Sequence, residues 1–302
     1  MQTHDLKLAV IGFGEAGRAF ASGWTRQNGA EIFVYDRQVI DPATRASFEA
    51  AAEAAQVTLA ASNSDAVENA GAIFSLVTAD RAHEAARESA TRIAPGAFFF
   101  DCNSCSPATK SASAAIMEQA GARYVDVAVM APVHPKRHET PILLSGPAAE
   151  AAVPFLARLG MQPRVAGERI GEASSIKMLR SVMIKGLEAL TAEAMLAARK
   201  AGVEAAVIAS LQASNPGIDW EKRSAYNLER MMVHGERRAA EMREVAATLR
   251  ELGLSDRMSA AIVEWESDIA GLKLEAGDAS LAGRADRILG AMADSTRDAD
   301  AV

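Results

Sequence analysis

The sequence predicts an α/β domain with a parallel, doubly wound sheet, followed by an all-α domain. From Leu6 to about Val165, short apolar runs alternate with alanine-rich helical stretches. This rhythm is typical of βαβ units. Beyond Gly171 the apolar residues recur only at helical spacing, so the second domain is expected to be helical. The change of period divides the chain into predicted domains 1–168 and 169–302.

Six apolar runs are predicted to form the strands of the sheet. A further run, followed by the turn Gly146-Pro147, indicates an added strand before a helix over Ala148–Gly160. Strands are expected to stop at Val165. The six predicted strands are Lys7–Ile11, Glu31–Tyr35, Val57–Ala60, Ala72–Val77, Ala97–Phe100 and Arg123–Val129, and the added one is Thr140–Ser145.

The second domain is predicted to begin with one long helix that ends near Lys200-Ala201-Gly202. More helices are expected after it, with breaks at Asn215-Pro216-Gly217 and at Leu252-Gly253-Leu254. The long helix is predicted from apolar residues that recur at helical spacing. These residues are Ile176, Leu179, Met183, Leu187, Leu190 and Ala194.

The composition is that of an ordinary globular protein, with 302 residues, 49% hydrophobic and 24% charged. A net charge of −7 argues against a nucleic-acid partner, which needs a basic excess on one face. Met1–Lys7 lacks the pattern of an export signal, and no apolar run reaches membrane-spanning length. Two cysteines cannot form a disulfide framework. We therefore expect a cytoplasmic protein with no nucleic-acid or membrane partner.

A glycine loop follows the first predicted strand and opens the helix after it. Its first glycine allows a tight turn, the second lets the backbone approach a pyrophosphate, and the third lets helix and strand pack closely. Asp36 ends the second strand 19 residues after Gly17, where a carboxylate can bind the adenosine ribose. A turn that needs glycines only for packing is the simpler alternative. The context predicts a Rossmann-type site lined by Gly12, Phe13, Gly14, Glu15, Ala16 and Gly17, with Val77 and Thr78 from a neighbouring strand end.

The choice between NAD and NADP depends on Asp36 and Arg37, which point to opposite answers. A carboxylate repels the 2′-phosphate of NADP, whereas a neighbouring guanidinium can clamp it. We favour NAD, because the acid occupies the strand-end position itself. Arg37 can equally lie in solvent or stack on adenine.

A second polar group follows the apolar strand Ala97–Phe100, in the segment Asp101–Pro107. Ligands of open α/β sheets bind at this edge, so Asn103 and Ser104 are candidates to contact the nicotinamide or a substrate carboxylate. Capping of the next helix is the alternative interpretation. The segment also holds a Cys-x-x-Cys pair, but the sequence has no second pair to complete a zinc site. No metal site is therefore expected.

With these motifs the chain resembles the β-hydroxyacid dehydrogenase superfamily, which includes 3-hydroxyisobutyrate, tartronate semialdehyde and 6-phosphogluconate dehydrogenases. The resemblance covers most of the chain. It rests on the glycine loop, Asn103–Pro107, Ala131-Pro132-Val133 and the segment Gly171–Lys177. In that superfamily a lysine near the start of the long helix is the catalytic acid/base, and Lys177 is the matching residue. The resemblance also implies a homodimer built through the C-terminal helices.

Three departures indicate a less characterised branch with its own C-terminal domain. Where members usually place Ser-Gly-Gly, this chain has His134-Pro135-Lys136. Ser181 replaces an asparagine one turn after the lysine, and Ala240-Glu241 stands where the family often carries Lys-Asp. Each departure weakens the transfer of a substrate from known members.

The residues themselves suggest acid/base chemistry on a small anionic or hydroxylated substrate. Lys177 and Ser181 lie at i and i+4 of a helix, so both can point into one cleft. A base beside the hydroxyl assists hydride removal from an alcohol carbon. The cationic loop 134–138 suggests an anion site in which His134 hydrogen-bonds to the substrate. A solvated loop is an equal alternative, and a His134/His138 metal site is disfavoured.

We therefore expect an NAD(P)-dependent oxidoreductase that transfers a hydride between nicotinamide and a hydroxyacid or related alcohol. The catalytic candidates are Lys177, Ser181, Asn103, Ser104 and His134. A dinucleotide-binding regulatory protein without turnover remains an alternative. An imine reductase on the same scaffold is less favoured, because those enzymes usually replace the lysine.

Overall fold

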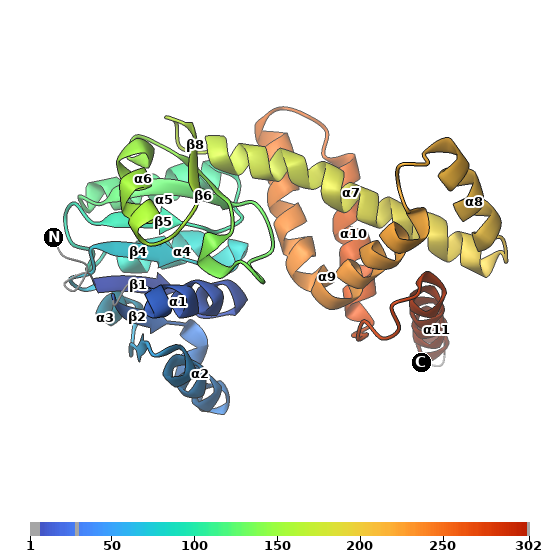
Figure 1. The fold of residues 1–302 in the computed structure, drawn as a ribbon, viewed down its shortest axis with the longest axis horizontal. Helices are drawn as coiled ribbons and strands as arrows, with labels where there is room; N and C mark the ends of the chain where they lie inside the picture. The colour runs from blue at the N-terminus through green and yellow to red at the C-terminus, as the bar shows by residue number, and fades with distance from the viewer. Residues whose placement is uncertain (1–6, 28–29, 301–302) are drawn as a thin grey trace. The chain divides into compact units, whose positions relative to one another are not determined.

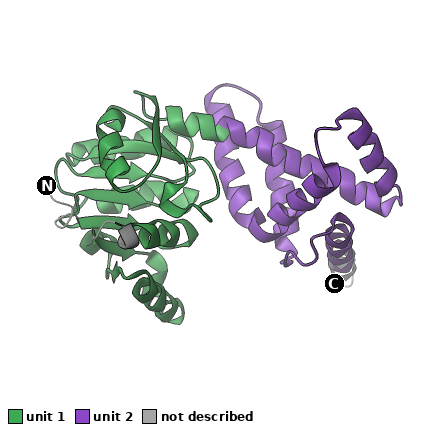
Figure 2. Cartoon of the chain, viewed as in Figure 1, with its two compact units in different colours: residues 1–178 green, residues 179–302 purple. Residues whose placement is uncertain are grey.

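The computed structural model describes residues 7–27 and 30–300. The expectation that Met1–Lys7 is not an export signal concerns a segment of which only Lys7 is among the described residues. The chain divides into two compact units, residues 1–178 and 179–302 (Figure 2). None of the described helices combines the length and the apolar character needed to cross a membrane.

Unit 1 is built on one eight-stranded sheet, drawn in Figure 1. The strand order is β3-β2-β1-β4-β5-β6-β7-β8, and every neighbouring pair is parallel except β6 and β7. The direction of winding reverses between β1 and β4, the position at which such sheets bind their ligands. The predicted doubly wound domain is confirmed. The strands are β1 (Lys7–Ile11), β2 (Glu31–Tyr35), β3 (Thr58–Leu59), β4 (Ala72–Ser75), β5 (Phe98–Asp101), β6 (Arg123–Val129), β7 (Ile142–Ser145) and β8 (Pro163–Gly167).

Helices connect the parallel strands, and several begin at side chains that cap them. Asp41, Ser62 and Ser106 each accept a hydrogen bond from a backbone N–H of the helix that follows, which satisfies donors left open at a helix start. The α-helices are α1 (Glu15–Gln27), α2 (Pro42–Ala55), α3 (Asn63–Val67), α4 (Ala82–Ser89), α5 (Pro107–Gln119) and α6 (Ala149–Arg158). Short 3₁₀ turns are η2 (Arg37–Ile40), η3 (Ala79–Arg81) and η4 (Arg137–Glu139).

Aromatic side chains fill the centre of this unit. Phe74 of β4 lies between Trp24 and Phe100, with ring centroids 4.5 Å and 4.7 Å away. Phe155 of α6 packs on Phe100 at 5.9 Å. Such pairs contribute about 0.5–1.5 kcal/mol each beyond the area they bury. The sheet that carries the candidate site is therefore rigidly packed.

The antiparallel pair β6 and β7 forms a hairpin with a long loop. Asp126 lies opposite Ser145, and beyond the strands Met130 N–H donates to the carbonyl of Pro141 at 3.0 Å. Both ends of the intervening loop, residues 131–140, therefore lie at the carboxyl end of β6. This is the loop that contains the predicted anion site.

An eighth strand, β8, was not among the predicted ones. It pairs parallel with β7 over Pro163–Gly167. The sequence signal is weak there, because Pro163 and Arg164 interrupt the apolar pattern and every residue of the strand is at least partly exposed. An edge strand tolerates proline and polar residues that a central strand does not.

Unit 2 is helical, as predicted, and the predicted breaks coincide with helix ends. Its helices pack around Met195, Leu228, Met231 and Ile269, among other buried residues. Gly235 lets α9 and α10 approach closely, since a Cβ there would lie 2.6 Å from the carbonyl oxygen of Glu266. The helices are α7 (Glu172–Lys200), which begins in unit 1, α8 (Glu204–Ser214), α9 (Trp220–Glu251), α10 (Arg257–Gly271) and α11 (Leu281–Asp300).

The long helix α7 buries a different face from the one its apolar residues suggest. Ser181, Lys185 and Glu188 are buried, with exposures of 7%, 5% and 3%. The apolar stripe used to predict the helix is largely exposed: Ile176 44%, Leu179 42%, Met183 65%, Leu187 42% and Leu190 56%. Periodicity thus predicted the helix correctly but not the face that the rest of the chain covers.

Candidate active site

The glycine loop lies at the carboxyl end of β1, beside the loop after β4. Gly12 has a φ of +94°, and a Cβ there would lie 2.5 Å from the carbonyl oxygen of Leu76. A Cβ on Gly17 would lie 2.0 Å from the carbonyl oxygen of Gly12. Gly14, in contrast, has nothing within 4 Å of a Cβ. The first and third glycines are therefore required by the protein itself, whereas the second faces open space.

Asp36 joins the end of β2 to the glycine loop. Its Oδ2 accepts from the N–H of Phe13 at 2.9 Å, and its Oδ1 accepts from the N–H of Gln38 at 3.0 Å. The side chain is 8% exposed. The carboxylate is thus held by backbone donors in one orientation, next to the glycine loop.

The other predicted cofactor residues lie around this loop in different environments. The Phe13 side chain is fully buried in the core, its N–H donates to Asp36 and its carbonyl oxygen accepts from Arg18, so Phe13 supports the loop from within. Glu15 is exposed and Ala16 half-buried at the start of α1. Val77, next to Gly12, is half-buried, and Thr78 is exposed. Both follow β4, because that strand ends at Ser75, two residues earlier than predicted.

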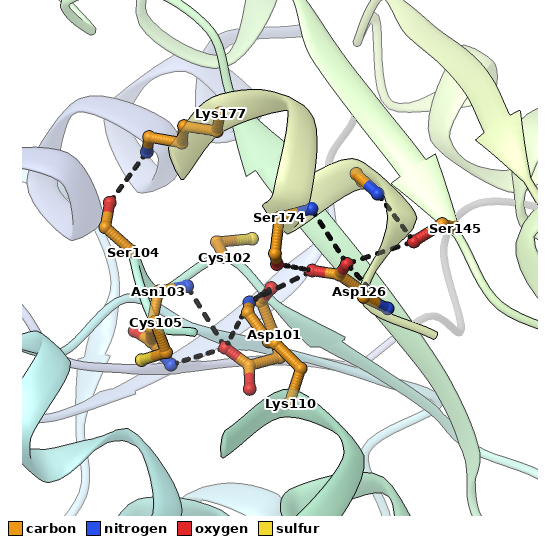
Figure 3. Close-up of polar contacts among 12 residues, drawn as sticks. Asp101, Cys102, Asn103, Ser104, Cys105, Lys110, Asp126, Ser145, Ser174 and Lys177 are labelled. Atoms are coloured by element: carbon orange, nitrogen blue, oxygen red, sulfur yellow. Dashed lines mark hydrogen bonds and ion pairs between the residues drawn. The ribbon is translucent and has the colours of Figure 1, made fainter. Parts of the chain in front are cut away.

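Lys177 of α7 and Ser104, from the segment after β5, are brought together. Lys177 Nζ donates to Ser104 Oγ at 2.7 Å, in a partly buried position (Figure 3). The two residues are 73 positions apart in sequence. The predicted strand-end motif and the predicted catalytic lysine therefore form a single cluster.

Asn103, beside Ser104, has an amide whose orientation is fixed. Its Nδ2 donates to Asp101 Oδ1 at 2.7 Å and to Ser75 Oγ at 2.9 Å. A carboxylate only accepts, so the amide oxygen must point away from Asp101. That oxygen, Oδ1, is buried and has no hydrogen-bond partner among the described residues. It is an acceptor that lacks a donor.

The first turn of α7 is tied to β6 through Asp126. Asp126 Oδ2 accepts from the N–H groups of Gly171 at 3.2 Å and Ser174 at 3.0 Å, and from Ser145 Oγ at 3.0 Å. Ser174 Oγ donates to Asp126 Oδ1 at 2.5 Å, and Ser145 Oγ accepts from the N–H of Ala173 at 2.9 Å. A carboxylate at this place satisfies donors that a helix start leaves open and complements the helix dipole. Lys177 follows Ser174 by three residues.

A buried lysine connects these two parts of the site. Lys110 of α5 is fully buried, and its Nζ lies 2.9 Å from Asp101 Oδ1 and 3.3 Å from Asp126 Oδ1. Burial lowers the pKa of Lys110, but the charges of Asp101 and Asp126 outweigh it, so the pKa is raised overall. Tyr124 OH donates to Asp101 Oδ2 at 2.7 Å. Lys110 therefore stays protonated between two carboxylates.

Sequence reasoning did not select Lys110, Asp126 or Ser174. The available signal was Asp126 itself, a charged residue within the otherwise apolar run Tyr124–Val129. A buried carboxylate of this kind requires partners. The sequence does not say which residues supply them.

The two other predicted catalytic residues, His134 and Ser181, lie in different environments. His134 is exposed in the loop after β6, and the described residues include no hydrogen-bond partner for it. Lys136 beside it is exposed as well. Ser181 is buried on α7, one turn after Lys177, within unit 2. The structure leaves their roles as predictions.

The two cysteines are free and buried. Burial raises the pKa of Cys102 to about 12, although the charge of Lys110 acts in the opposite direction. A thiol of this kind is not a nucleophile at neutral pH. Cys102 is thus a buried thiol of the strand end, and Cys105 Sγ donates to the carbonyl oxygen of Ala79 at 3.4 Å.

Unit 2 holds a buried cluster of ion pairs that includes Glu241. Ala240-Glu241 is the place where the sequence departs from the Lys-Asp of the better-known β-hydroxyacid dehydrogenases. Lys185 Nζ lies 2.8 Å from Glu241 Oε2. Arg238 pairs with Glu188 and with Glu266, the latter at 3.2 Å. Burial raises the pKa of Glu266 despite the Arg238 charge. Glu241, which stands in the place of the family's Lys-Asp, is thus a partner of Lys185.

Comparison with known proteins identifies two families whose sequences match parts of this chain. Residues 7–167 match the family described as the NAD binding domain of 6-phosphogluconate dehydrogenase. Residues 198–269 match a domain of unknown function, DUF1932. The resemblance stated from the sequence motifs is therefore confirmed, including the separate C-terminal branch.

Solved structures extend the match over nearly the whole chain. A conserved hypothetical protein from Sinorhizobium meliloti 1021 is 35% identical, with a TM-score of 0.74 over 96% of this chain and 98% of that one. The 3-hydroxyisobutyrate dehydrogenase of Mycobacterium tuberculosis, solved with L-serine, is 16% identical with a TM-score of 0.72, over 94% of this chain and 98% of that one.

A more distant neighbour is a reductive aminase from Aspergillus terreus, solved with NADPH, cyclohexanone and allyl amine. It is 20% identical with a TM-score of 0.54, over 86% of this chain and 92% of that one. At such identities the likeness shows the fold alone. The family match spans more than half of the chain and therefore shows membership. The chain belongs to the family that shares the NAD-binding domain of 6-phosphogluconate dehydrogenase, in a branch with its own helical second domain.

Proposed function

We propose that this protein is an NAD-dependent dehydrogenase that moves a hydride between nicotinamide and a small hydroxyacid or related alcohol, with Lys177 as the acid/base. The observation that carries the proposal is the 2.7 Å contact between Lys177 Nζ and Ser104 Oγ. It brings a proton-transfer group and a polar strand end together in the unit that carries the glycine loop.

The residues present fit a dinucleotide. Open space over Gly14 leaves room for a pyrophosphate, and the following helix α1 offers backbone N–H groups to it. Asn103 Oδ1, buried without a donor, suits the NH₂ of a nicotinamide carboxamide. When bound, the dinucleotide supplies the hydride acceptor or donor.

NAD is favoured over NADP because of Asp36. Its carboxylate is anchored by two backbone N–H groups, so it cannot swing away from a ribose bound beside it. A 2′-phosphate there would meet a fixed negative charge. Arg37, which is exposed and has no ion-pair partner among the described residues, favours NADP instead, because its guanidinium can pair with a 2′-phosphate.

Lys177 and Ser104 divide the proton chemistry between them. A neutral Lys177 Nζ takes the hydroxyl proton of an alcohol during oxidation, and the protonated form returns it during reduction. Ser104 Oγ accepts from Lys177 and keeps its own hydrogen, with which it donates to a substrate oxygen. The serine thus orients the oxygen whose proton the lysine transfers.

The substrate is proposed to be small and anionic or hydroxylated. The loop between β6 and β7 presents His134 and Lys136 to solvent at the ligand edge of the sheet. An ammonium and an imidazole there suit a carboxylate or phosphate. This assignment rests on loop chemistry and is independent of the role of Lys177.

A homodimer through the C-terminal helices is proposed from the exposed face of α7. Met183, Leu187 and Leu190 repeat along one side of the helix and are 65%, 42% and 56% exposed. Tyr226 and Val233 of α9 are exposed to similar degrees. Apolar side chains repeated along exposed helices mark an interaction surface. A second copy of the chain is the partner that the family resemblance implies.

A substrate screen tests the proposal. Hydroxyacids are incubated with the protein and NAD or NADP, and the corresponding aldehydes and ketones, with and without an added amine, are incubated with the protein and NADH or NADPH. The absorbance of the reduced nicotinamide is followed. Turnover of a hydroxyacid with NAD supports the proposal. Tight cofactor binding with no turnover of any substrate would favour a regulatory protein, and turnover only of ketone and amine together would favour an imine reductase.

A further inference from the structure

Lys110 lies in the interior of unit 1, away from solvent, yet the two halves of the candidate site meet at its ammonium group. A lysine with no exposed surface is rare, because removing its charge from water is costly. Here the cost is offset by two carboxylates and a carbonyl, since Nζ also donates to the carbonyl oxygen of Asp101 at 2.6 Å. Replacing such a group by packed apolar residues is often neutral or stabilising. Stability alone therefore does not explain a lysine at this position.

The first branch from Lys110 leads to the strand-end motif. Asp101 is the last residue of β5, and its Oδ1 accepts from Lys110 Nζ, from the N–H of Asn103 at 3.1 Å and from Asn103 Nδ2 at 2.7 Å. The backbone of Asn103 is therefore held directly before Ser104. Fixing this turn fixes the place of the hydroxyl that meets Lys177.

The second branch leads to the helix that carries Lys177. Asp126 lies next to Asp101 in register on β6, and it holds the first turn of α7 through Gly171 and Ser174. Ser174 precedes Lys177 by three residues, so the same helical turn contains both. Figure 3 shows the two branches meeting at Lys110.

We propose that Lys110 is a positioning residue: with Asp101, Asp126 and Ser174 it forms a buried bracket that sets the distance between Lys177 Nζ and Ser104 Oγ. The inference rests on the proposed function for the meaning of that distance. We assign the bracket no proton-transfer step: every oxygen of its two carboxylates accepts from a protein donor, and Lys110 has no exposed surface. Its effect on catalysis is geometric.

The test compares two serine variants that each lose one buried hydroxyl. Ser174→Ala removes the hydroxyl that donates to Asp126. Ser113→Ala is the matched control, because Ser113 is also fully buried and lies on the same helix as Lys110, but its hydroxyl contacts His83 instead. Lys110→Met removes the centre of the bracket and is the stronger variant, provided that thermal melting shows it to be folded.

Two readouts are measured on the full-length protein. The first is kcat together with the dissociation constant of the cofactor, and the second is the rate at which an amine-acylating reagent labels Lys177, followed by peptide mass spectrometry. A misplacement on the order of 1 Å costs up to about 100-fold in rate. We expect Ser174→Ala to lower kcat by about 10-fold and to change the labelling rate of Lys177, with the cofactor dissociation constant within about twofold of wild type. Ser113→Ala should alter none of these.

The outcomes separate this inference from the proposed function. Equal effects of Ser174→Ala and Ser113→Ala on kcat and on labelling would overturn the bracket while leaving Lys177 as acid/base. If Ser174→Ala alters the labelling of Lys177, the bracket is retained. If Lys177→Met also keeps full turnover, the acid/base role of Lys177 is rejected while the bracket stands. A folded Lys110→Met variant with wild-type kcat and wild-type labelling would also overturn the bracket.

Discussion

Asp36 Oδ2 accepts the backbone N–H of Phe13 at 2.9 Å, across 23 residues of sequence. The bond connects the end of β2 directly to the glycine loop. It means that the acid proposed to select NAD is also part of the loop's own structure. Substitution of Asp36 therefore tests cofactor choice and loop order together.

Asp36→Ser is expected to shift the preference from NAD towards NADP by roughly tenfold, because the repulsion of a 2′-phosphate is relieved and Arg37 is left to pair with it. Dissociation constants for both cofactors, measured by calorimetry, give the ratio. Asp41→Ser is the matched control, since Asp41 likewise accepts from a backbone N–H, that of Ala43 at 2.9 Å, but at the start of α2. An unchanged ratio in Asp36→Ser would place discrimination elsewhere.

Gly14→Val is expected to abolish dinucleotide binding in a protein that still folds. The open space over Gly14 accepts a side chain, but that side chain then fills the volume of the pyrophosphate. Calorimetry measures the affinity and thermal melting the fold. Gly217→Val is the control, because Gly217 also has nothing within 4 Å of a Cβ but lies in unit 2.

The neighbouring glycines should respond differently. Gly12→Ala and Gly17→Ala are expected to lower the melting temperature, because their Cβ atoms would lie 2.5 Å and 2.0 Å from backbone oxygens. Full affinity in a folded Gly14→Val variant would remove the glycine loop from the proposed cofactor site.

Lys177→Met is expected to lower kcat by roughly 10²–10⁴-fold while cofactor affinity persists, because the apolar stem is kept and only the proton-transfer group is lost. The measurement is kcat on a substrate found in the screen, with a cofactor titration of both proteins. Lys200→Met, at the exposed end of the same helix, controls for the loss of a lysine from α7. Near-normal kcat in Lys177→Met would end the assignment of this residue as acid/base.

Leu187→Glu is expected to convert a dimer into monomers, because it buries a carboxylate within the apolar face of α7. Sedimentation equilibrium across a range of concentrations measures the change in mass. Ile40→Glu is the control, since Ile40 is 72% exposed but lies in unit 1. The proposed interface is wrong if wild type is monomeric, or if Leu187→Glu leaves the mass of a dimer unchanged.

Much of unit 1 could be predicted because its signals are local. The turn at Gly12 needs a positive φ, and the acid at Asp36 stands at a fixed distance from the loop, so both are visible in sequence. The contact between Lys177 and Ser104 was not visible as geometry. The family resemblance supplied the role of Lys177, and strand-end chemistry supplied Ser104, but nothing local joins residues 73 positions apart.

The remaining features depend on tertiary contacts that have no sequence period. Lys110 lies on a helix rich in alanine and serine, and only the strands beneath it show that its ammonium meets two carboxylates. The buried face of α7 was missed for a related reason. A stripe such as Met183 and Leu187 shows that a helix is amphipathic, but it does not show whether the same chain or another one covers it.

The antiparallel pairing of β6 with β7 keeps the exposed part of one loop separate from the strands that carry it. Met130 and Pro141 are joined by a backbone hydrogen bond, which closes the loop between them at its base. Within this loop Val133, His138 and Thr140 are buried, whereas the stretch 134–136 is exposed. Asp126, which caps α7, lies within β6, four residues before Met130. The exposed stretch His134-Pro135-Lys136 can therefore be substituted without replacing a buried residue or a strand residue, so the proposed substrate contacts can be varied apart from the fold.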